Sequence, residues 1–408
     1  MAIVAAATIA TEAFRRPDQF SHPAVWDESG AQILPQYLRH GFLSLVEPVN
    51  GYLVLPAKLV DILAWKLSAT HYPEIAFSLT ILVQILVLCC IALAPTTLRH
   101  PLLCAVLPLA VPTDPETFGV SLYLLWWGTL LLVPAVLWDE RRSRRVWPRM
   151  LMVVVGALSS PTIVAVLPLF VWRWWKSGRQ RRELAVLLVA SACGAVQAWL
   201  VLAAGAGGAH LDLRLGDAPQ VVGKFFGLPF VATWSWDDGV VVGVGVLVLA
   251  VLVAGAISLR RAAPGTSTTS TSLAYLTVAA IGMSLCRAPI EAVHPVLAGP
   301  RYFFYPYVFL AWLLLQHTGA KSVTVRVVAT VLLSLAALQA VLIGPRHHDD
   351  LPWAESLMAC AGGETPQAIT ALPVHYDGVA ERAWHVDLTT AECRRLVDGG
   401  ILHRLDGT

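Results

Sequence analysis

Residues 76–94 read AFSLTILVQILVLCCIALA and carry no charged side chain. A helix that crosses the hydrocarbon core of a bilayer needs roughly 20 mostly apolar residues, so this stretch predicts a transmembrane helix. The other long apolar stretches are residues 120–138, 183–204, 239–259, 272–288, 301–316 and 323–344, and the shorter ones are residues 101–112, 148–158 and 162–174. Because Ser159-Ser160-Pro161 separates the last two, we expect two short crossings that meet at a break.

The overall composition agrees with a membrane environment. The chain has 408 residues, of which 56% are hydrophobic and only 14% charged, and its mean hydropathy is +0.64. Soluble domains carry roughly a quarter of their residues as charged ones. The formal net charge of +2 offers no basic surface for a nucleic-acid partner. We therefore expect an all-α polytopic membrane protein surrounded by lipid, with about 10–11 transmembrane helices.

Charge placement in the loops predicts an orientation. Basic residues gather in one set of loops: Arg99, residues 141–145, residues 176–182, Arg260, Arg261, Lys321 and Arg326. Of the 27 acidic residues, only Asp139, Glu140 and Glu183 fall in that set. Because short cytoplasmic loops are rich in Lys and Arg, we expect the other set to face outward: residues 14–75, 113–119, 205–238, 289–300 and 345–408. Residues 2–13 are too few to cross alone, and we expect them to end a longer first helix.

Residues 345–408 are predicted to form a small outward α+β domain beside the bundle of residues 1–344. Residues 368–375 and 384–388 alternate like strands, and residues 390–397 read as a helix. Cys360 and Cys393 lie in this tail, where an oxidising compartment favours a disulfide between them, although spacing alone does not prove it. The other cysteines lie in apolar stretches and are expected to pack there. Residues 262–271, rich in Ser and Thr, suggest a flexible cytoplasmic linker.

The outward segment 14–75 contains the first candidate site, the pair Asp27-Glu28 beside Trp26. A carboxylate next to an indole at the edge of a membrane bundle is expected to have a raised pKa, which suits a general base. An ordinary solvated turn is the alternative, because Asp, Ser and Gly are common turn residues. Further along, residues 53–67 have apolar residues at near-helical spacing with Lys58, Asp61 and Lys66 between them. That pattern predicts a helix lying along the membrane surface.

Two other outward segments carry candidate substrate-binding residues. Asp114 and Glu116 lie in a turn that faces the first loop, or else they cap the start of a helix. Arg301 opens an apolar stretch beside Tyr302, where it suits a phosphate contact or serves as an interfacial anchor. Arg287 lies near apolar sequence, where a charge is costly and usually paired or functional, and Glu291 is its candidate partner.

The loop 205–238 adds Lys224 and Trp236, together with several acids. Indoles that stack on sugar rings beside carboxylates that accept their hydroxyls suit a sugar-binding surface, and they suit an interfacial belt equally well. The sequence has no zinc-spaced Cys/His array, phosphate-binding Gly-rich loop or nucleophile elbow. The run His347-His348-Asp349-Asp350 suits a metal ion, but a solvated hinge is the simpler interpretation. We expect no certain cofactor and leave a divalent metal open.

This plan resembles the GT-C superfamily of membrane glycosyltransferases and a little-characterised bacterial group of that type. The segments that carry the resemblance are Trp26-Asp27-Glu28-Ser29-Gly30, Asn50-Gly51-Tyr52-Leu53, residues 112–116 and Gly299-Pro300-Arg301-Tyr302. The resemblance implies a polyprenyl-phosphate-linked sugar as donor, a glycan or lipid as acceptor, and action at the outer face of the cytoplasmic membrane. It places Asp27 or Glu28 as the base that deprotonates the acceptor, and Arg301 near the donor phosphate. The short first helix and the small outer domain depart from the pattern.

Two other functions fit the same sequence. One is a transporter or flippase for a lipid-linked glycan, which commonly has internal repeats and ionisable residues at mid-membrane depth. No convincing repeat is visible, and the polar residues within the apolar stretches are few: Gln84, Gln197 and Gln339. The other is a non-catalytic membrane subunit of an envelope-assembly complex. Acids concentrated in outward loops favour surface chemistry, and therefore the glycosyltransferase.

Overall fold

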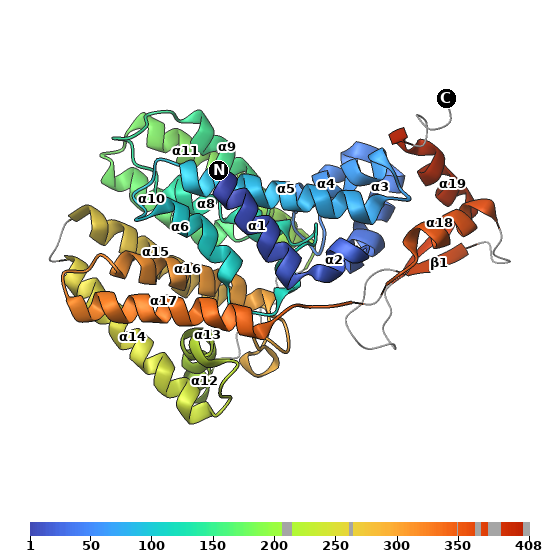
Figure 1. The fold of residues 1–408 in the computed structure, drawn as a ribbon. Coiled ribbons are helices and arrows are strands. Elements are labelled where there is room, and N and C mark those ends of the chain that lie inside the picture. The colour runs from blue at the N-terminus through green and yellow to red at the C-terminus, as the bar shows by residue number, and fades with distance from the viewer. Residues whose placement is uncertain (206–213, 261–263, 349, 364–368, 374–384, 403–408) are drawn as a thin grey trace.

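The computed structural model describes residues 1–205, 214–260, 264–348, 350–363, 369–373 and 385–402, and most of them are helical (Figure 1). Four helices in this part of the chain are long and apolar enough to cross a membrane, judged by length and composition: Tyr72–Leu93, Arg181–Ala203, Asp238–Leu259 and Val323–Ile343. Each coincides with a long apolar stretch of the sequence. The protein is therefore helical, with several helices suited to lipid.

The first half of the chain forms mostly short helices and turns, together with the two long helices α5 and α11. They are α1 (Ala2–Arg15), α2 (Pro17–Ser21), the π-helical turn η1 (Ser29–Ile33), α3 (Leu34–His40), the 3-10 turn η2 (Gly41–Val46), α4 (Leu55–Leu67), α5 (Tyr72–Leu93), α6 (Pro101–Val106) and the 3-10 turns η3 (Leu107–Ala110) and η4 (Pro115–Thr117). The series continues with α7 (Leu124–Thr129), α8 (Leu132–Val136), α9 (Trp147–Ala157), α10 (Ile163–Lys176) and α11 (Arg181–Ala203).

The stretch 120–138 is not one continuous helix, contrary to the sequence-based expectation. It forms the two short helices α7 and α8, and its residues are buried almost without exception, with Trp127 and Leu132 fully enclosed. Pro134 accounts for the interruption, because its ring clashes with the carbonyl group of residue 130 in a continuous helix. The buried position shows why the stretch is so apolar: it fills the centre of the bundle.

The break expected at Ser159-Ser160-Pro161 is present. Helix α9 ends at Ala157 and α10 begins at Ile163. The hydroxyl groups of Ser160 and Thr162 lie 2.8 Å apart, within hydrogen-bonding distance, and both side chains are almost fully buried. Irregular backbone at this depth is tolerated where it packs against protein or borders a cavity.

Helix α4 was expected along the membrane surface, but two of its three charged residues are buried and the third, Lys66, is partly buried. Lys58 and Asp61 are both fully enclosed. The ammonium group of Lys58 donates to the Gln36 side chain and to the carbonyl groups of Ser44 and Glu47, and the Tyr72 hydroxyl donates to Asp61 at 2.8 Å. These bonds satisfy the Lys58 ammonium and one oxygen of Asp61 internally, so this side of α4 packs in the core, while Leu59 and Leu63 of the same helix are exposed.

The second half of the chain begins with short turns and continues with long helices. Its elements are the 3-10 turn η5 (Leu215–Asp217), α12 (Ala218–Val222), the π-helical turn η6 (Gly223–Gly227), α13 (Leu228–Val231), α14 (Asp238–Arg260), α15 (Pro264–Leu285), the 3-10 turn η7 (Ile290–Ala292), α16 (Arg301–His317) and α17 (Val323–Ile343). Helices α14 to α17 lie side by side in one part of the molecule (Figure 1).

The expectation of a flexible linker at residues 262–271 is wrong from Pro264 onward, because α15 begins there. Residues 262 and 263 lie outside the described residues. Proline is well suited to the first helical position. The Ser/Thr run is helical because it packs against protein: Thr269, Ser270 and Ser272 are buried, and the Thr269 hydroxyl lies 2.6 Å from that of Thr97. A polar composition therefore marks a packed helix start here, not a flexible segment.

The C-terminal part contains α18 (Trp353–Gly362), β1 (Ile369–Pro373), β2 (His385–Thr389) and α19 (Thr390–Gly399). The two strands pair antiparallel, with Ile369 opposite Thr389, and a disulfide joins Cys360 to Cys393. These elements lie beside α3 and α4 (Figure 1): the Trp353 indole donates to the Ala69 carbonyl and Arg395 donates to the Leu38 carbonyl, both at 2.8 Å. The two strands lie within the expected segments 368–375 and 384–388 or extend them by one residue. Residues 368, 374, 375 and 384 of those segments lie outside the described residues.

The residues after α17 bind back to the first helices. The backbone amide of Arg346 donates to the Arg15 carbonyl at 2.9 Å, and its guanidinium pairs with Asp114 at 2.5 Å. His348 lies 3.1 Å from the Asp18 carboxylate, which also pairs with Arg16. A buried polar seam thus joins the first helices to the residues that follow the last long helix.

Candidate functional site

A cavity of about 580 Å³ lies between the first loop, the α9–α10 break and the facing ends of α15 and α16. We call it the Glu28 cavity. Its polar lining comprises Glu28, Asn50, Tyr52, Tyr123, Ser160, Thr162, Ser284, Arg287, Arg301, Tyr302 and Tyr305. Its apolar lining includes Val164, Ala165, Ala280 and Met283, and Val164 is 45% exposed on the surface of the bundle. The cavity therefore combines a charged part with an apolar part that reaches the outside of the bundle.

The acidic pair of the first loop lies just before η1. Glu28 lines the cavity, whereas Asp27 does not, and both side chains are partly buried. Burial raises the pKa of Asp27 to about 7, and the charges of Glu28 and Glu116 add to that effect. Burial also raises the pKa of Glu28. The Oδ1 atom of Asp27 is buried without a hydrogen-bond partner in the described part of the chain. Such a pair is suited to proton transfer near neutral pH.

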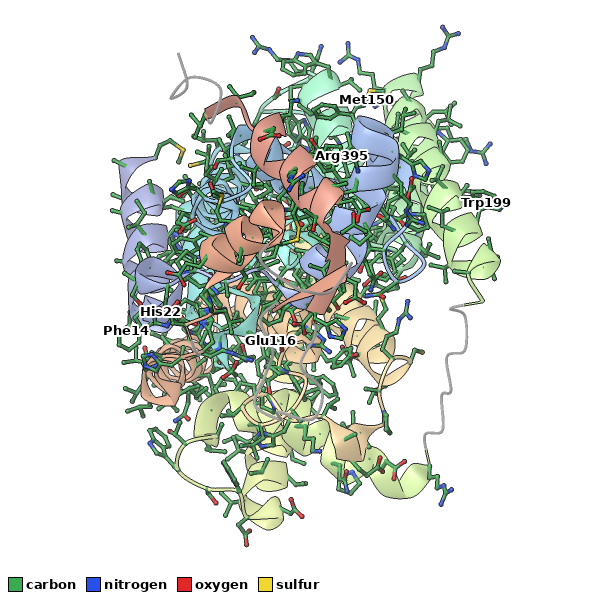
Figure 2. All side chains as sticks on the ribbon, turned by 90° about the vertical axis from the view of Figure 1, so that its right-hand side faces the viewer. Phe14, His22, Glu116, Met150, Trp199 and Arg395 are labelled. Atoms are coloured by element: carbon green, nitrogen blue, oxygen red, sulfur yellow. A yellow bond between two sulfur atoms is a disulfide. The ribbon has the colours of Figure 1, made fainter. Side chains whose placement is uncertain are left out.

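Arg301 is held by an acid from another part of the chain. Its guanidinium donates to Glu116, which also accepts a hydrogen bond from the Tyr123 hydroxyl, and Arg301 lies 3.3 Å from that hydroxyl. Glu116 is 3% exposed and lies near the middle of the molecule (Figure 2). The guanidinium also lies over the Tyr302 ring at 5.4 Å. Of the two acids expected in this segment, Asp114 and Glu116, it is thus Glu116 that binds residues lining the Glu28 cavity.

Asp114 has a different position. Its carboxylate accepts a hydrogen bond from the Glu116 amide at 3.1 Å, which caps the turn η4, and it pairs with Arg346. This agrees with the capping alternative read from the sequence. Asp114 therefore shapes the turn that presents Glu116, and it does not line the Glu28 cavity.

Arg287 lines the same cavity as Glu28, with an exposed side chain. The expected pairing with Glu291 is wrong: the two form no ion pair, and Glu291 lines another cavity. Among the described residues the Arg287 guanidinium has no ion-pair partner, in contrast to that of Arg301. Of the two arginines, Arg287 is thus the more available to an anion.

Lys224 and Trp236 lie outside the Glu28 cavity. They line a separate cavity of about 340 Å³ together with Asp238, Glu291 and His294. The Lys224 ammonium donates to the carbonyl groups of Ile290 and Val293 at 2.6 and 2.9 Å, and burial lowers the pKa of this lysine. The Trp236 ring lies 5.4 Å from that of His294. The expected substrate-binding residues are therefore divided between two cavities that share the segment between α15 and α16.

Several lining residues were not singled out from the sequence. Tyr123, Ser160 and Thr162 belong to the Glu28 cavity, and only the Pro-marked break hinted at the last two. Within the described residues, no group of three or more His, Cys, Asp or Glu side chains is arranged to hold a metal ion. Of the run 347–350, Asp349 lies outside the described residues, and His348 is paired with Asp18.

No protein-family model matches the chain, and comparisons with curated proteins and with solved structures also gave no match.

Proposed function

We propose that this protein is a membrane glycosyltransferase that moves a sugar from a polyprenyl-phosphate donor to a glycan or lipid acceptor. The observation that carries the proposal is the composition of the Glu28 cavity. A partly buried carboxylate, two arginines and an apolar region that reaches the bundle surface meet in one space. A lipid-linked sugar phosphate needs each of them: a base for the acceptor, cations for the phosphate and an apolar path for the chain.

The proposed reaction is a direct displacement. Glu28 accepts the proton of the acceptor hydroxyl, and the acceptor oxygen forms a bond to the anomeric carbon of the sugar. The bond between that carbon and the phosphate oxygen breaks, and the electron pair leaves with the polyprenyl phosphate. Arg287 and Arg301 balance the charge on the leaving phosphate. One displacement inverts the anomeric configuration, so a product with retained configuration contradicts this mechanism.

Asp27 has a supporting part in this proposal. Its pKa of about 7 means that it is partly protonated near neutral pH, next to a Glu28 that lines the cavity. A protonated Asp27 reduces the repulsion between the pair and leaves Glu28 ionised to accept the proton. Asp27→Asn, which mimics the protonated form, is therefore expected to lower transfer less than Glu28→Gln does.

The membrane arrangement is part of the proposal. About ten crossings of the cytoplasmic membrane, with residues 345–408 outside, place Glu28 and Arg301 at the outer face. Single cysteines at Leu297 (63% exposed) and at exposed Arg144 test it. In intact cells a membrane-impermeant maleimide is expected to label Leu297→Cys and to spare Arg144→Cys. Labelling only at Arg144 reverses the proposed orientation.

The activity is tested with purified protein in detergent. Radiolabelled polyprenyl-phosphate sugars are supplied as donors, with an envelope lipid and glycan extract as acceptor. Glu28→Gln is expected to lower transfer by a factor of about 10² to 10⁴, the usual contribution of a general base. Glu74→Gln, at an exposed acid outside the cavity, serves as the matched control and is expected to retain transfer.

Two results overturn the proposal. Transfer by Glu28→Gln at the wild-type rate would show that Glu28 is not the base. The absence of transfer from every donor by folded protein favours a transporter of a lipid-linked glycan, or a non-catalytic subunit.

A further inference from the structure

A third cavity, of about 300 Å³, lies at the opposite ends of α15 and α16 from the Glu28 cavity. We call it the His317 cavity. Its lining residues from α14 are Leu249, Leu252, Val253, Ala256 and Leu259; those from α15 are Ser270, Thr271, Ala274, Thr277 and Val278; the others are Phe226, Leu313 and His317. From Ser270 to Val278 the α15 wall is about 12 Å long, because a helix rises 1.5 Å per residue. The space is thus a slot parallel to the helices.

His317, one of the residues that line this slot, has one polar atom without a described partner. The side chain is 1% exposed. Its Nδ1 lies 2.7 Å from the Leu313 carbonyl oxygen, which only accepts hydrogen bonds, so Nδ1 carries the proton. In a neutral imidazole the other nitrogen, Nε2, is then an acceptor, and it has no partner within the described residues. Another lining residue, Ser270, also has a buried hydroxyl oxygen without a described partner.

The position of His317 is fixed by close packing. A Cβ atom placed on Gly255 of α14 would lie 1.8 Å from Cδ2 of the imidazole and 2.4 Å from Nε2. Only a glycine lets the helix approach the ring so closely. An imidazole held in one orientation, with its acceptor atom buried, is a preorganised partner for a hydrogen-bond donor.

The lining defines the chemistry of the occupant. None of the described lining residues is charged, which disfavours a phosphate, carboxylate or ammonium group in the slot. A volume near 300 Å³ is large enough to hold water, but each water needs two to four polar partners, and the walls are mostly apolar. An apolar chain with one neutral donor suits both the apolar walls and the acceptor Nε2.

The slot also opens on the outside of the bundle. Two of its lining residues, Val253 and Val278, are 60% and 67% exposed on the outside of the bundle. Residues 238–259 of α14 form one of the helices apolar enough to cross a membrane. We propose that the His317 cavity binds a long-chain lipid alcohol that enters from the bilayer between α14 and α15, donates its hydroxyl to His317 Nε2 and lays its chain along the slot.

Photolabelling of the full-length protein in detergent tests this site independently of sugar transfer. The probe is a long-chain alcohol with a diazirine in its chain, and the comparison probe is the matching alkane without the hydroxyl. Mass spectrometry of the labelled peptides is expected to place the alcohol on α14 and α15. His317→Phe keeps an aromatic ring and removes the acceptor, so labelling by the alcohol is expected to fall about fivefold, the usual value of one hydrogen bond. Labelling by the alkane is expected to be weaker and unchanged in this variant.

A blocking variant separates occupancy of the slot from general contact with lipid. Ala274→Trp fills the slot and is expected to lower alcohol labelling at least tenfold. Leu188→Trp, at a 59% exposed position on α11, is the matched control and is expected to leave labelling unchanged. If Ala274→Trp does not fold, Val253→Trp at the opening replaces it. Equal labelling by alcohol and alkane, or labelling that the blocking variant leaves intact, overturns the proposal.

Discussion

Arg301 and Glu116 are 185 positions apart in the chain, yet the guanidinium of Arg301 donates directly to the Glu116 carboxylate. Glu116 is 4% exposed at its side chain and Arg301 is 39% exposed. The pair thus joins a buried acid in a 3-10 turn to a cation at the opening residue of α16. Because Tyr123 donates to the same carboxylate, Glu116 fixes both the start of α16 and the wall of the Glu28 cavity.

Glu116→Gln is expected to lower the unfolding free energy by about 1–3 kcal/mol. Breaking a fully buried pair costs more, but the partial exposure of Arg301 reduces the effect. The loss is measured by denaturation in detergent. The double variant Glu116→Gln/Arg301→Gln is expected to be less destabilised than the sum of the single variants, because no unpaired charge is left. Additive losses mean that the two side chains do not interact.

Stability is expected to fall as the pH rises from about 4 to about 7, through the titration of Asp27. The pKa of this residue is raised from 3.8 to about 7 on folding, so between these values the folded chain holds a proton that the unfolded chain has released. The unfolding free energy therefore decreases with pH in this window. Asp27→Asn removes this contribution, and is expected to be more stable than the wild type at pH 8 by on the order of 2 kcal/mol.

Thermal unfolding of both proteins at pH 5 and pH 8 gives the comparison. A stability difference between them that does not change with pH shows that Asp27 titrates normally. A gain in stability when Asp27 is replaced is typical of functional sites, where the residues needed for activity often lower the stability of the fold.

The Cys360–Cys393 disulfide closes a loop between residues 33 positions apart. Its removal in Cys360→Ala is expected to cost about 3 kcal/mol, from the greater freedom of the unfolded segment. Limited proteolysis is expected to cut α18 and α19 sooner in this variant than in the wild type. Cys89→Ala, which removes a free cysteine, is the matched control. Identical digestion of the two variants would show that the disulfide does not hold these elements together.

Glu183 binds two arginines on the side of the bundle that we assign to the cytoplasm. Arg149 donates to it at 2.7 and 2.9 Å, and Arg173 donates at 2.9 and 3.0 Å. Glu183→Gln leaves two cations facing each other and is expected to cost about 3–5 kcal/mol. The yield of folded protein and its melting temperature measure this loss. Glu74→Gln, at an exposed acid, is expected to change neither.

The long helices could be predicted from the sequence because hydropathy reports on the surroundings of a whole segment. Residues 76–94 and 239–259 each lie almost entirely within a long helix of the structure. The stretch 120–138 was misread for the same reason: lipid and protein interior both select apolar side chains, and hydropathy does not distinguish them. The Ser/Thr run before residue 272 was misread because polar side chains that pack within a bundle look like those of a solvated linker.

The candidate site could be predicted only in part, because side chains meet through tertiary contacts. Aromatic and polar context in the sequence pointed to Glu28 and Arg301, and both line one cavity. Their joint position with Ser160 depends on how α10 packs beside α15, which no local pattern records. Lys224 and Trp236 were selected by the same aromatic and polar context as the other candidates, but they line a different cavity.

The seam between Arg346 and the Arg15 and Asp114 segments has a consequence for biogenesis. Residue 346 leaves the ribosome after α17, so α1 and the turn that carries Glu116 are translated long before their partner exists. Until then the carbonyl group of Arg15 lacks this bond. Chains released before residue 346 therefore retain all four of the long apolar helices described here and lack this connection between the two ends of the bundle.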